Sequence, residues 1–182
     1  MLTTSDRVEV DPISVPPVDV PTFRAAMRLL VGGVAIVACG SGASRRGLTV
    51  TSVCSLSNSP PSILVCVNRS AEANAIIQNT RRFSINMLTA EHVPLAKRFS
   101  AQDGVKGSER FTMGRWFENQ TGVPILADSL CSLECLLTGM HDVATHTIFI
   151  GMIVDVMKRD DYSPLAYADG KFFELGSLPL LE

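Results

Sequence analysis

Short hydroxyl side chains follow one another in a segment whose other residues are typical of a strand. Residues 47–52 read Gly-Leu-Thr-Val-Thr-Ser, and an extended chain would place Thr49 and Thr51 on the same face. Hydroxyls and backbone amides at this position could hold a polar ring or a phosphate. A strand with solvated threonines has the same composition, so both interpretations stay open.

A second polar segment has the order expected at an anion site. Residues 66–70 read Cys-Val-Asn-Arg-Ser, ending one predicted strand and opening a helix. The unpaired N–H groups of a helix start, with Arg69 nearby, attract anions, although Ser70 could be only an N-cap. Residues 40–47 have the glycine spacing of a phosphate loop, but Leu48 stands where the lysine belongs, so a hairpin turn is favoured.

The three histidines are the remaining candidates for chemistry. His92, His141 and His146 share no zinc-type spacing, so the sequence predicts no metal site. His92 is expected on the surface of a helix and His141 in a turn. His146 opens the run Thr-Ile-Phe-Ile-Gly, where the rim of a barrel could present it to a ligand.

Composition limits the class of protein that could carry these segments. The chain has 182 residues, 46% of them hydrophobic, which fits one packed domain. Its 16 basic and 18 acidic side chains give no field to hold a nucleic acid. The longest apolar run, residues 29–39, is too short to span a membrane, and no secretory signal is present, so a cytoplasmic location is expected. The five cysteines are expected to be buried free thiols: Cys39, Cys54, Cys66, Cys131 and Cys135.

Strands outnumber helices in the predicted order of elements. An N-terminal arm, 1–20, precedes a domain over 21–182 that starts with an amphipathic helix capped by Thr22 and ended at Gly32-Gly33. Helices are also expected over 70–79 and from Thr89 to Phe99, and 103–122 should be a long surface excursion. The strands are too closely spaced for a helix between each pair, so an antiparallel sheet closed into a barrel is predicted. The predicted strands are residues 34–39, 47–55, 63–67, 83–88, 129–138, 145–155, 164–167 and 172–175.

Several motifs, in this order and spacing, resemble the short-chain flavin reductases. These enzymes are the reductase components of two-component flavin monooxygenases. The resemblance covers residues 21–175. The matching segments are Phe23-Arg24-x-Ala26-Met27, residues 47–52, Ser55-Leu56-Ser57-x-x-Pro60-Pro61, Phe83-Ser84-Ile85-Asn86-x-Leu88, Ala96-x-x-Phe99, Gly122-x-Pro124 and His146-x-x-Phe149-x-Gly151.

The resemblance implies a mainly β protein with short flanking helices, the FMN-binding split β-barrel with Greek-key antiparallel strands. It implies a homodimer that binds FAD or FMN, with FAD favoured, and NAD(P)H, with NADH as the hydride donor. The reduced flavin would then diffuse to a partner oxygenase acting on an aromatic compound, such as a chlorinated or nitro-substituted phenol. Hydride transfer needs alignment of two bound rings, so no catalytic triad or metal is required.

The resemblance also assigns residues to the site. His146 would lie beside the nicotinamide, in Ala144-Thr145-His146 where the family has Gly-Asp-His. Gly170 and Phe172 match a segment that approaches the nicotinamide nucleotide. The positions that match flavin contacts are Arg46, Gly47, Leu48, Thr49, Thr51, Ser52, Cys66, Val67, Asn68, Arg98 and Phe99.

Two other functions fit the same sequence. One is a flavin-binding electron carrier of the same barrel without a site for NAD(P)H. The other is a flavin-dependent reductase of a different acceptor, such as ferric iron or a corrin. Flavin-dependent oxidation of NADH would separate an enzyme from a carrier.

Overall fold

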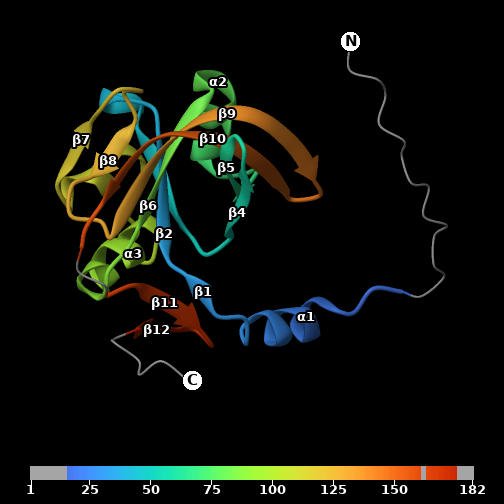
Figure 1. The fold of residues 1–182 in the computed structure, drawn as a ribbon. Helices are drawn as coiled ribbons and strands as arrows, with labels where there is room; N and C mark the ends of the chain where they lie inside the picture. The colour runs from blue at the N-terminus through green and yellow to red at the C-terminus, as the bar shows by residue number, and fades with distance from the viewer. Residues whose placement is uncertain (1–15, 161–162, 176–182) are drawn as a thin grey trace, which may run out of the picture.

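The computed structural model describes residues 16–160 and 163–175, and Figure 1 shows the arrangement of their helices and strands. Most of the predicted arm, 1–20, therefore lies outside the described residues. The helices are α1 Val20–Met27, α2 Glu72–Thr80 and α3 Val93–Phe99, with 3-10 turns at Gly42–Ser44, Ala90–His92 and Gly107–Thr112. The strands are β1 Gly32–Gly33, β2 Ala35–Cys39, β3 Arg46–Val50, β4 Val53–Asn58, β5 Pro61–Asn68, β6 Arg82–Met87, β7 Trp116–Glu118, β8 Pro124–Leu126, β9 Cys131–Val143, β10 His146–Lys158, β11 Leu165–Ala168 and β12 Lys171–Glu174.

The main sheet has seven antiparallel strands in the order β3-β2-β6-β9-β10-β5-β4. Its two edge strands, β3 and β4, are consecutive in the chain and are separated only by Thr51 and Ser52. The sheet therefore has to curl until these two edges come together. The described strands nevertheless include no β3–β4 pair. We call this unpaired junction the seam. The arrangement confirms the predicted split barrel.

Strand β2 is buried along its whole length because both of its faces are covered. Its alternate side chains point to opposite sides of the sheet. Val37 packs inside the barrel with Val65, Phe83 and Phe149. Ile36 and Ala38 face a second core, which is formed with Leu88, Leu95, Phe99 and Leu126. Helix α3 and the β7–β8 hairpin thus hold the outside of β2, next to the edge strand β3.

The segment 103–122 is mostly exposed, as the sequence predicts, but a buried aromatic side chain anchors it. Phe111 is buried, and its ring centroid lies 5.0 Å from that of Phe99 and 4.9 Å from that of Trp116. The hairpin that follows is fixed by polar side chains of the sheet: Ser84 donates to the carbonyl of Pro124 at 2.6 Å, and Asn86 accepts from the amide of Leu126 at 2.8 Å. Buried partners of this kind keep the backbone polar groups satisfied.

Helix α1 is shorter than predicted, and none of its residues is buried. Asp19 caps it instead of Thr22, whose amide donates to the Asp19 carboxylate at 2.8 Å, and this bond lowers the pKa of Asp19. The helix ends at Met27, so the apolar residues up to Val31 lie outside it. Figure 1 shows α1 projecting from the barrel beside β1.

Two further predictions of local structure are wrong. The run 47–55 is not one strand, because the chain bends at Thr51 and leaves the sheet at one edge to return at the other. Ser70 does not cap α2; Ala71 is the N-cap, and Ser70 instead donates its amide and hydroxyl to Asn68 Oδ1 at 2.9 and 2.8 Å. Such an Asx turn provides hydrogen-bond partners for the polar groups between β5 and α2 from within the same segment.

All five cysteines are free, but only two are buried. Burial raises the pKa of Cys39 and that of Cys135 to about 12. Cys54 is exposed on the edge strand β4, which contradicts the expectation of a buried thiol there. Within 16–160 and 163–175, no helix has the length and apolar character needed to cross a membrane.

Candidate functional site

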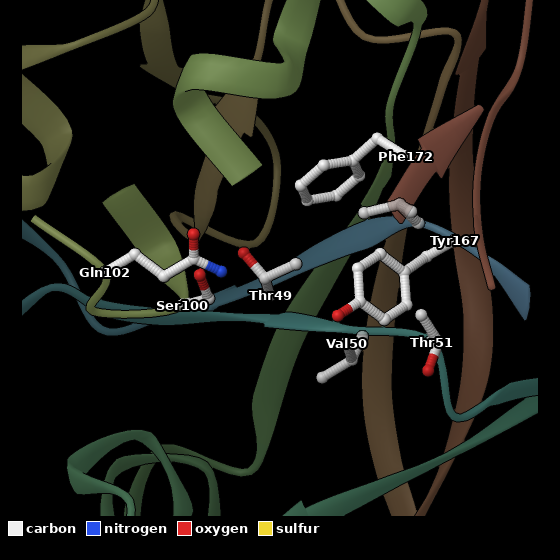
Figure 2. A pocket seen from close by; sticks show the side chains of 8 residues that line it. Thr49, Val50, Thr51, Ser100, Gln102, Tyr167 and Phe172 are labelled. Atoms are coloured by element: carbon white, nitrogen blue, oxygen red, sulfur yellow. The ribbon is translucent and has the colours of Figure 1, made fainter. Parts of the chain in front are cut away.

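The free edge of β3 borders a pocket of about 210 Å³. Figure 2 shows the side chains of Thr49 and Gln102 on one side of it and the rings of Tyr167 and Phe172 on the other. The two rings pack edge to face, with centroids 5.1 Å apart. The lining residues are Val34, Thr49, Val50, Thr51, Ser100, Gln102, Tyr167 and Phe172. We call this space the hydroxyl pocket; it offers an aromatic wall and several polar groups to one ligand.

Two of the hydroxyl groups predicted to meet a ligand, those of Thr49 and Ser52, already have partners within the protein. Thr49 donates to the carbonyl of Ala96 at 2.7 Å. Ser52 donates to the carbonyl of Cys66 at 2.9 Å, and the amide of Cys66 donates to the carbonyl of Ser52 at 3.2 Å. A hydroxyl that donates keeps its lone pairs, so each oxygen can still accept from a ligand.

A larger hollow of about 960 Å³ adjoins the hydroxyl pocket and shares Thr51 and Tyr167 with it. Its other wall is α1 and the segment that follows, including Phe23, Met27 and Leu30. Gly170 lies at its edge in the β11–β12 turn, close to Arg28, which pairs with Asp169 at 3.5 Å. The hydroxyl pocket is thus continuous with an open hollow lined by apolar side chains and by Arg24 and Arg28.

The other end of β3 borders a hollow of about 310 Å³ with a basic lining. We call it the basic hollow; Arg46, Lys106 and Arg110 reach it, together with Glu72 and the start of α2. Arg110 is held in place because it donates to the carbonyls of Val105 at 2.9 Å and Gly47 at 3.0 Å. Cations around a helix start are suited to a phosphate group.

The predicted residues of the β5–α2 junction, Cys66, Val67 and Asn68, line none of these three spaces. The side chain of Val67 is fully buried in the barrel, so only its backbone could face a ligand. Cys66 is half-buried, and Asn68 is exposed and occupied by the Asx turn with Ser70. Arg69, which the anion argument used, lies away from the basic hollow and pairs with Asp142 at 3.7 Å.

Arg98 and Phe99 hold in place the strand and the loop that border the site. Phe99 is 1% exposed, and a Cβ atom added to Gly47 would lie 2.7 Å from its ring, so glycine allows β3 to pack directly on this ring. Arg98 donates to Asp103 at 2.9 Å and to Thr112 at 3.2 Å. The pKa of Asp103 is lowered, mainly by the amide of Val105 and then by Arg98. These contacts hold the loop that carries Lys106 and Arg110.

His146 lies apart from the other two residues assigned to the nicotinamide. It is exposed at the start of β10, opposite Asn68 of β5, and its Nδ1 lies 2.9 Å from the Thr145 hydroxyl. Phe172 is in the hydroxyl pocket and Gly170 is in the adjoining hollow, and His146 lines neither. Within one chain, the described residues do not bring these three positions into one space.

The remaining histidines, His92 and His141, differ from expectation. His92 is buried, not on the surface, because its Nδ1 contacts Thr89 at 2.8 Å and its Nε2 lies 3.5 Å from Asp128. His141 is inside β9, not in a turn. The described part of the chain contains no group of three or more His, Cys, Asp or Glu side chains able to hold a metal ion.

Sequence reasoning missed several residues of these spaces, and four of them have side chains suited to a ligand. Tyr167 and Gln102 line the hydroxyl pocket, and Lys106 and Arg110 line the basic hollow. Lys106 and Arg110 belong to the segment read as a surface excursion, whose basic residues near Arg98 were a usable signal. Tyr167 opposes Phe172 across the β11–β12 pair, which only the strand register reveals.

Comparison with known proteins gives the family of this barrel. The family profile described as "Flavin reductase like domain" matches residues 27–176, so the chain belongs to this family. FMN reductase (NADH) RutF of Serratia proteamaculans strain 568 is 34% identical over 164 residues, covering 90% of this chain and 93% of the relative. The 4-hydroxyphenylacetate 3-monooxygenase reductase component of Pseudomonas aeruginosa PAO1 is 30% identical over 153 residues, covering 84% of this chain and 90% of the relative.

A solved structure agrees with both relatives. Flavin reductase HpaC complexed with NADP+ superposes with a TM-score of 0.76 at 31% identity, covering 87% of this chain and 99% of HpaC. The predicted class, an oxidoreductase of the flavin reductase family with a split-barrel fold, is thereby confirmed.

Proposed function

We propose that this protein reduces FMN or FAD with a hydride from NADH and releases the reduced flavin to a partner oxygenase. The observation that carries the proposal is the pair of spaces along β3. Arg46 at the basic hollow and Thr49 at the hydroxyl pocket are about 10 Å apart at the rise of an extended strand. A ribityl chain can span that distance, with its ring at Thr49 and its phosphate at Arg46.

The roles of the predicted flavin residues follow from their places. Thr49 and Thr51 border the ring, with Ser52 at the seam, while Gly47 and Leu48 pass below the ribityl chain. We assign Cys66, Val67 and Asn68 to the phosphate end on the family resemblance, because the junction to which they belong continues into Ser70 and Ala71 at the basic hollow. Arg98 and Phe99 act as positioning residues, since Phe99 is buried under Gly47 and Arg98 is bonded to Asp103.

Among flavins, we propose FMN as the preferred substrate. The sequence favoured FAD, but the RutF relatives are named FMN reductases. The basic hollow holds three cationic side chains, which suits the terminal phosphate of FMN. NADH is the donor in the RutF names, whereas HpaC was solved with NADP+, so the choice of NADH over NADPH belongs to the proposal.

In the reaction, a nicotinamide carbon delivers a hydride to the flavin, and an oxidised nicotinamide leaves. The protein has to hold the two rings in contact and keep water out. The wall of Tyr167 and Phe172 supplies an apolar face for stacking, and Gln102 supplies an amide at the rim. We assign the nicotinamide to this side, with Gly170 near the rest of the dinucleotide.

We further propose a homodimer in which a second copy covers α1 and the segment after it. This surface exposes large apolar side chains that a monomer would leave in water: Val20, Phe23, Met27, Leu29, Leu30 and Val31. The same contact would let His146 of one subunit approach the nicotinamide bound to the other. Sedimentation of the wild type as a monomer at micromolar concentration would contradict this arrangement.

The partner's substrate is proposed as an aromatic compound, in the class of chlorinated or nitro-substituted phenols. The support is the relative named as the reductase component of 4-hydroxyphenylacetate 3-monooxygenase. A flavin carrier and a reductase of ferric iron or a corrin are the alternatives. The cytoplasmic location expected from the sequence stays a prediction.

Steady-state oxidation of NADH and NADPH with FMN, FAD and riboflavin in turn tests the central proposal. We expect flavin-dependent oxidation of NADH that is fastest with FMN. We also expect dialysis to remove the flavin, because the proposed site holds it by noncovalent contacts alone. If the protein binds flavin but oxidises neither NADH nor NADPH, the flavin carrier is the correct function. If oxidation requires a ferric or corrin acceptor, the protein is a flavin-dependent reductase of that acceptor.

A further inference from the structure

Glu72 places a negative charge inside the basic hollow. Its carboxylate accepts from Nε of Arg46, in an ion pair with side chains 61% and 28% exposed, respectively. The hollow is otherwise lined by cations, Lys106 and Arg110, and by neutral residues of β3 and α2. The single acidic side chain of this lining therefore sits where the proposed ligand carries its own negative charge.

The Nη1 group of the Arg46 guanidinium is held by the protein. Its Nη1 donates to the carbonyls of Ala43 at 3.0 Å and Arg45 at 2.9 Å, which fixes the group at the mouth of the hollow. The donor at Nε, turned toward the start of α2, is the one taken by Glu72. A phosphate entering the hollow needs the same kind of charged donor, so carboxylate and phosphate compete for Arg46.

Glu72 is also well placed to remain there when the hollow is empty. It is the first residue of α2, and Ala71 before it supplies no side-chain cap. A carboxylate in the first turn of a helix is favoured by the unpaired N–H groups. The ion pair thus persists without a ligand, and a ligand must displace it or accept the repulsion of a nearby like charge.

We propose that Glu72 is an affinity-setting residue that competes with the flavin phosphate for Arg46 and so speeds exchange of the flavin. The inference rests on the proposed function, and it concerns phosphate-bearing flavins, FMN and FAD. The affinity for riboflavin, which lacks a phosphate, should not depend on Glu72. A reductase that hands its product to another protein benefits from binding that is no tighter than turnover requires.

Equilibrium binding of FMN and riboflavin to the Glu72→Gln variant tests the proposal. Glutamine keeps the shape and a hydrogen-bond acceptor but removes the charge. We expect the Kd for FMN to fall about three- to fivefold, the size typical of one partly exposed charge. The Kd for riboflavin should stay within a factor of about two. Glu91→Gln, an exposed carboxylate on the turn before α3 that lines none of the three spaces, is the control for net charge and should leave both constants unchanged.

The opposite sign would give Glu72 a different role. If Glu72 serves to align Arg46 for the phosphate, Glu72→Gln will bind FMN more weakly, and the proposal is wrong. Equal tightening of FMN and riboflavin would also overturn it, because the effect would not depend on the phosphate. Thermal unfolding of each variant checks that the fold is intact.

A second background isolates the competition. In Arg46→Gln, binding of FMN should be weaker, and adding Glu72→Gln should change the Kd less than twofold. If Glu72→Gln lowers the Kd for FMN as much without Arg46 as with it, Glu72 acts by general repulsion of the phosphate. That result overturns the proposed competition for Arg46. Failure of the wild type to bind either flavin would instead remove the proposed function, whereas equal affinity for FMN and riboflavin would remove only the phosphate site in the basic hollow.

Discussion

Thr49 on β3 donates its hydroxyl to the carbonyl of Ala96 on α3, with 2.7 Å between the two oxygens. The bond ties the edge strand of the barrel to the helix that covers its neighbour β2. Thr49 also lines the hydroxyl pocket, so one hydroxyl serves the fold and faces the proposed ligand. Its substitution cannot affect binding alone.

We therefore expect Thr49→Val to change two quantities. Loss of the hydrogen bond should lower the free energy of unfolding by about 1 kcal/mol, and loss of an acceptor for the flavin should raise its Kd about fivefold. Thr49→Ser keeps the hydroxyl and should stay near the wild type in both. Urea unfolding and flavin titration measure the two effects. An affinity that does not change in Thr49→Val would limit this residue to a structural role.

Gly47→Ala should disturb the strand beneath the proposed flavin. The new Cβ atom would lie 2.7 Å from the ring of Phe99 and 3.0 Å from the carbonyl oxygen of Val37. Overpacking of this kind typically costs about 1–3 kcal/mol. Gly139→Ala in β9 is the matched control, because its Cβ would make only ordinary contacts, the nearest at 3.5 Å. Phe99→Leu should recover part of the loss in the double variant, and no recovery would mean that Phe99 is not the obstacle.

His146→Ala should slow reduction of the flavin by NADH and leave flavin affinity nearly unchanged. The imidazole is exposed and contacts Thr145, away from the hydroxyl pocket, so its removal should not disturb flavin binding or folding. Stopped-flow reduction at saturating flavin measures the rate, with His141→Ala as an exposed control on β9. A wild-type rate and NADH dependence would remove His146 from the site. Loss of flavin affinity would place it beside the flavin instead.

Stability should fall in alkaline solution because of two buried thiols. Burial raises the pKa of Cys39 and of Cys135 from 9.0 to about 12, so the folded chain keeps protons that the unfolded chain loses. The contribution of the two thiols to the free energy of unfolding is complete below pH 9. It is lost as pH rises toward 12, at up to about 1.4 kcal/mol per pH unit for each thiol.

Urea unfolding between pH 7 and 10.5 measures this slope. Cys135→Ala should reduce the slope, whereas Cys54→Ala, which removes an exposed thiol, should leave it unchanged. The same slope in Cys135→Ala and the wild type would contradict a role for the buried thiol in the alkaline loss of stability.

The strands were predictable because their β-branched residues lie in short runs between turn residues. Ile36, Val37 and Val65 are fully buried, as the apolar runs indicated. The break at Thr51 was not predictable, since residues 47–55 have a uniform composition and only barrel closure makes the chain change edges. The packing of Phe111 with Phe99 and Trp116 was not predictable, because the three rings come together only in three dimensions.

The candidate site was predicted less completely than the fold. The hydroxyl segment at Thr49 does border a pocket, but its facing wall, Tyr167 and Phe172, comes from the far end of the chain. The anion argument chose Arg69, whereas the structure gathers Arg46, Lys106 and Arg110, because the direction of a side chain depends on strand register and loop packing. The resemblance to a family identified Arg46, which spacing alone did not.

The seam between β3 and β4 separates ligand exchange from the integrity of the sheet. In a fully paired barrel, a ring that hydrogen-bonds to a strand backbone has to displace an existing rung of the ladder. Among the described strands, β3 pairs only with β2, so its other side can exchange one partner for another without disturbing β2. A protein built this way can load and unload its flavin in every turnover while the seven-stranded framework stays rigid.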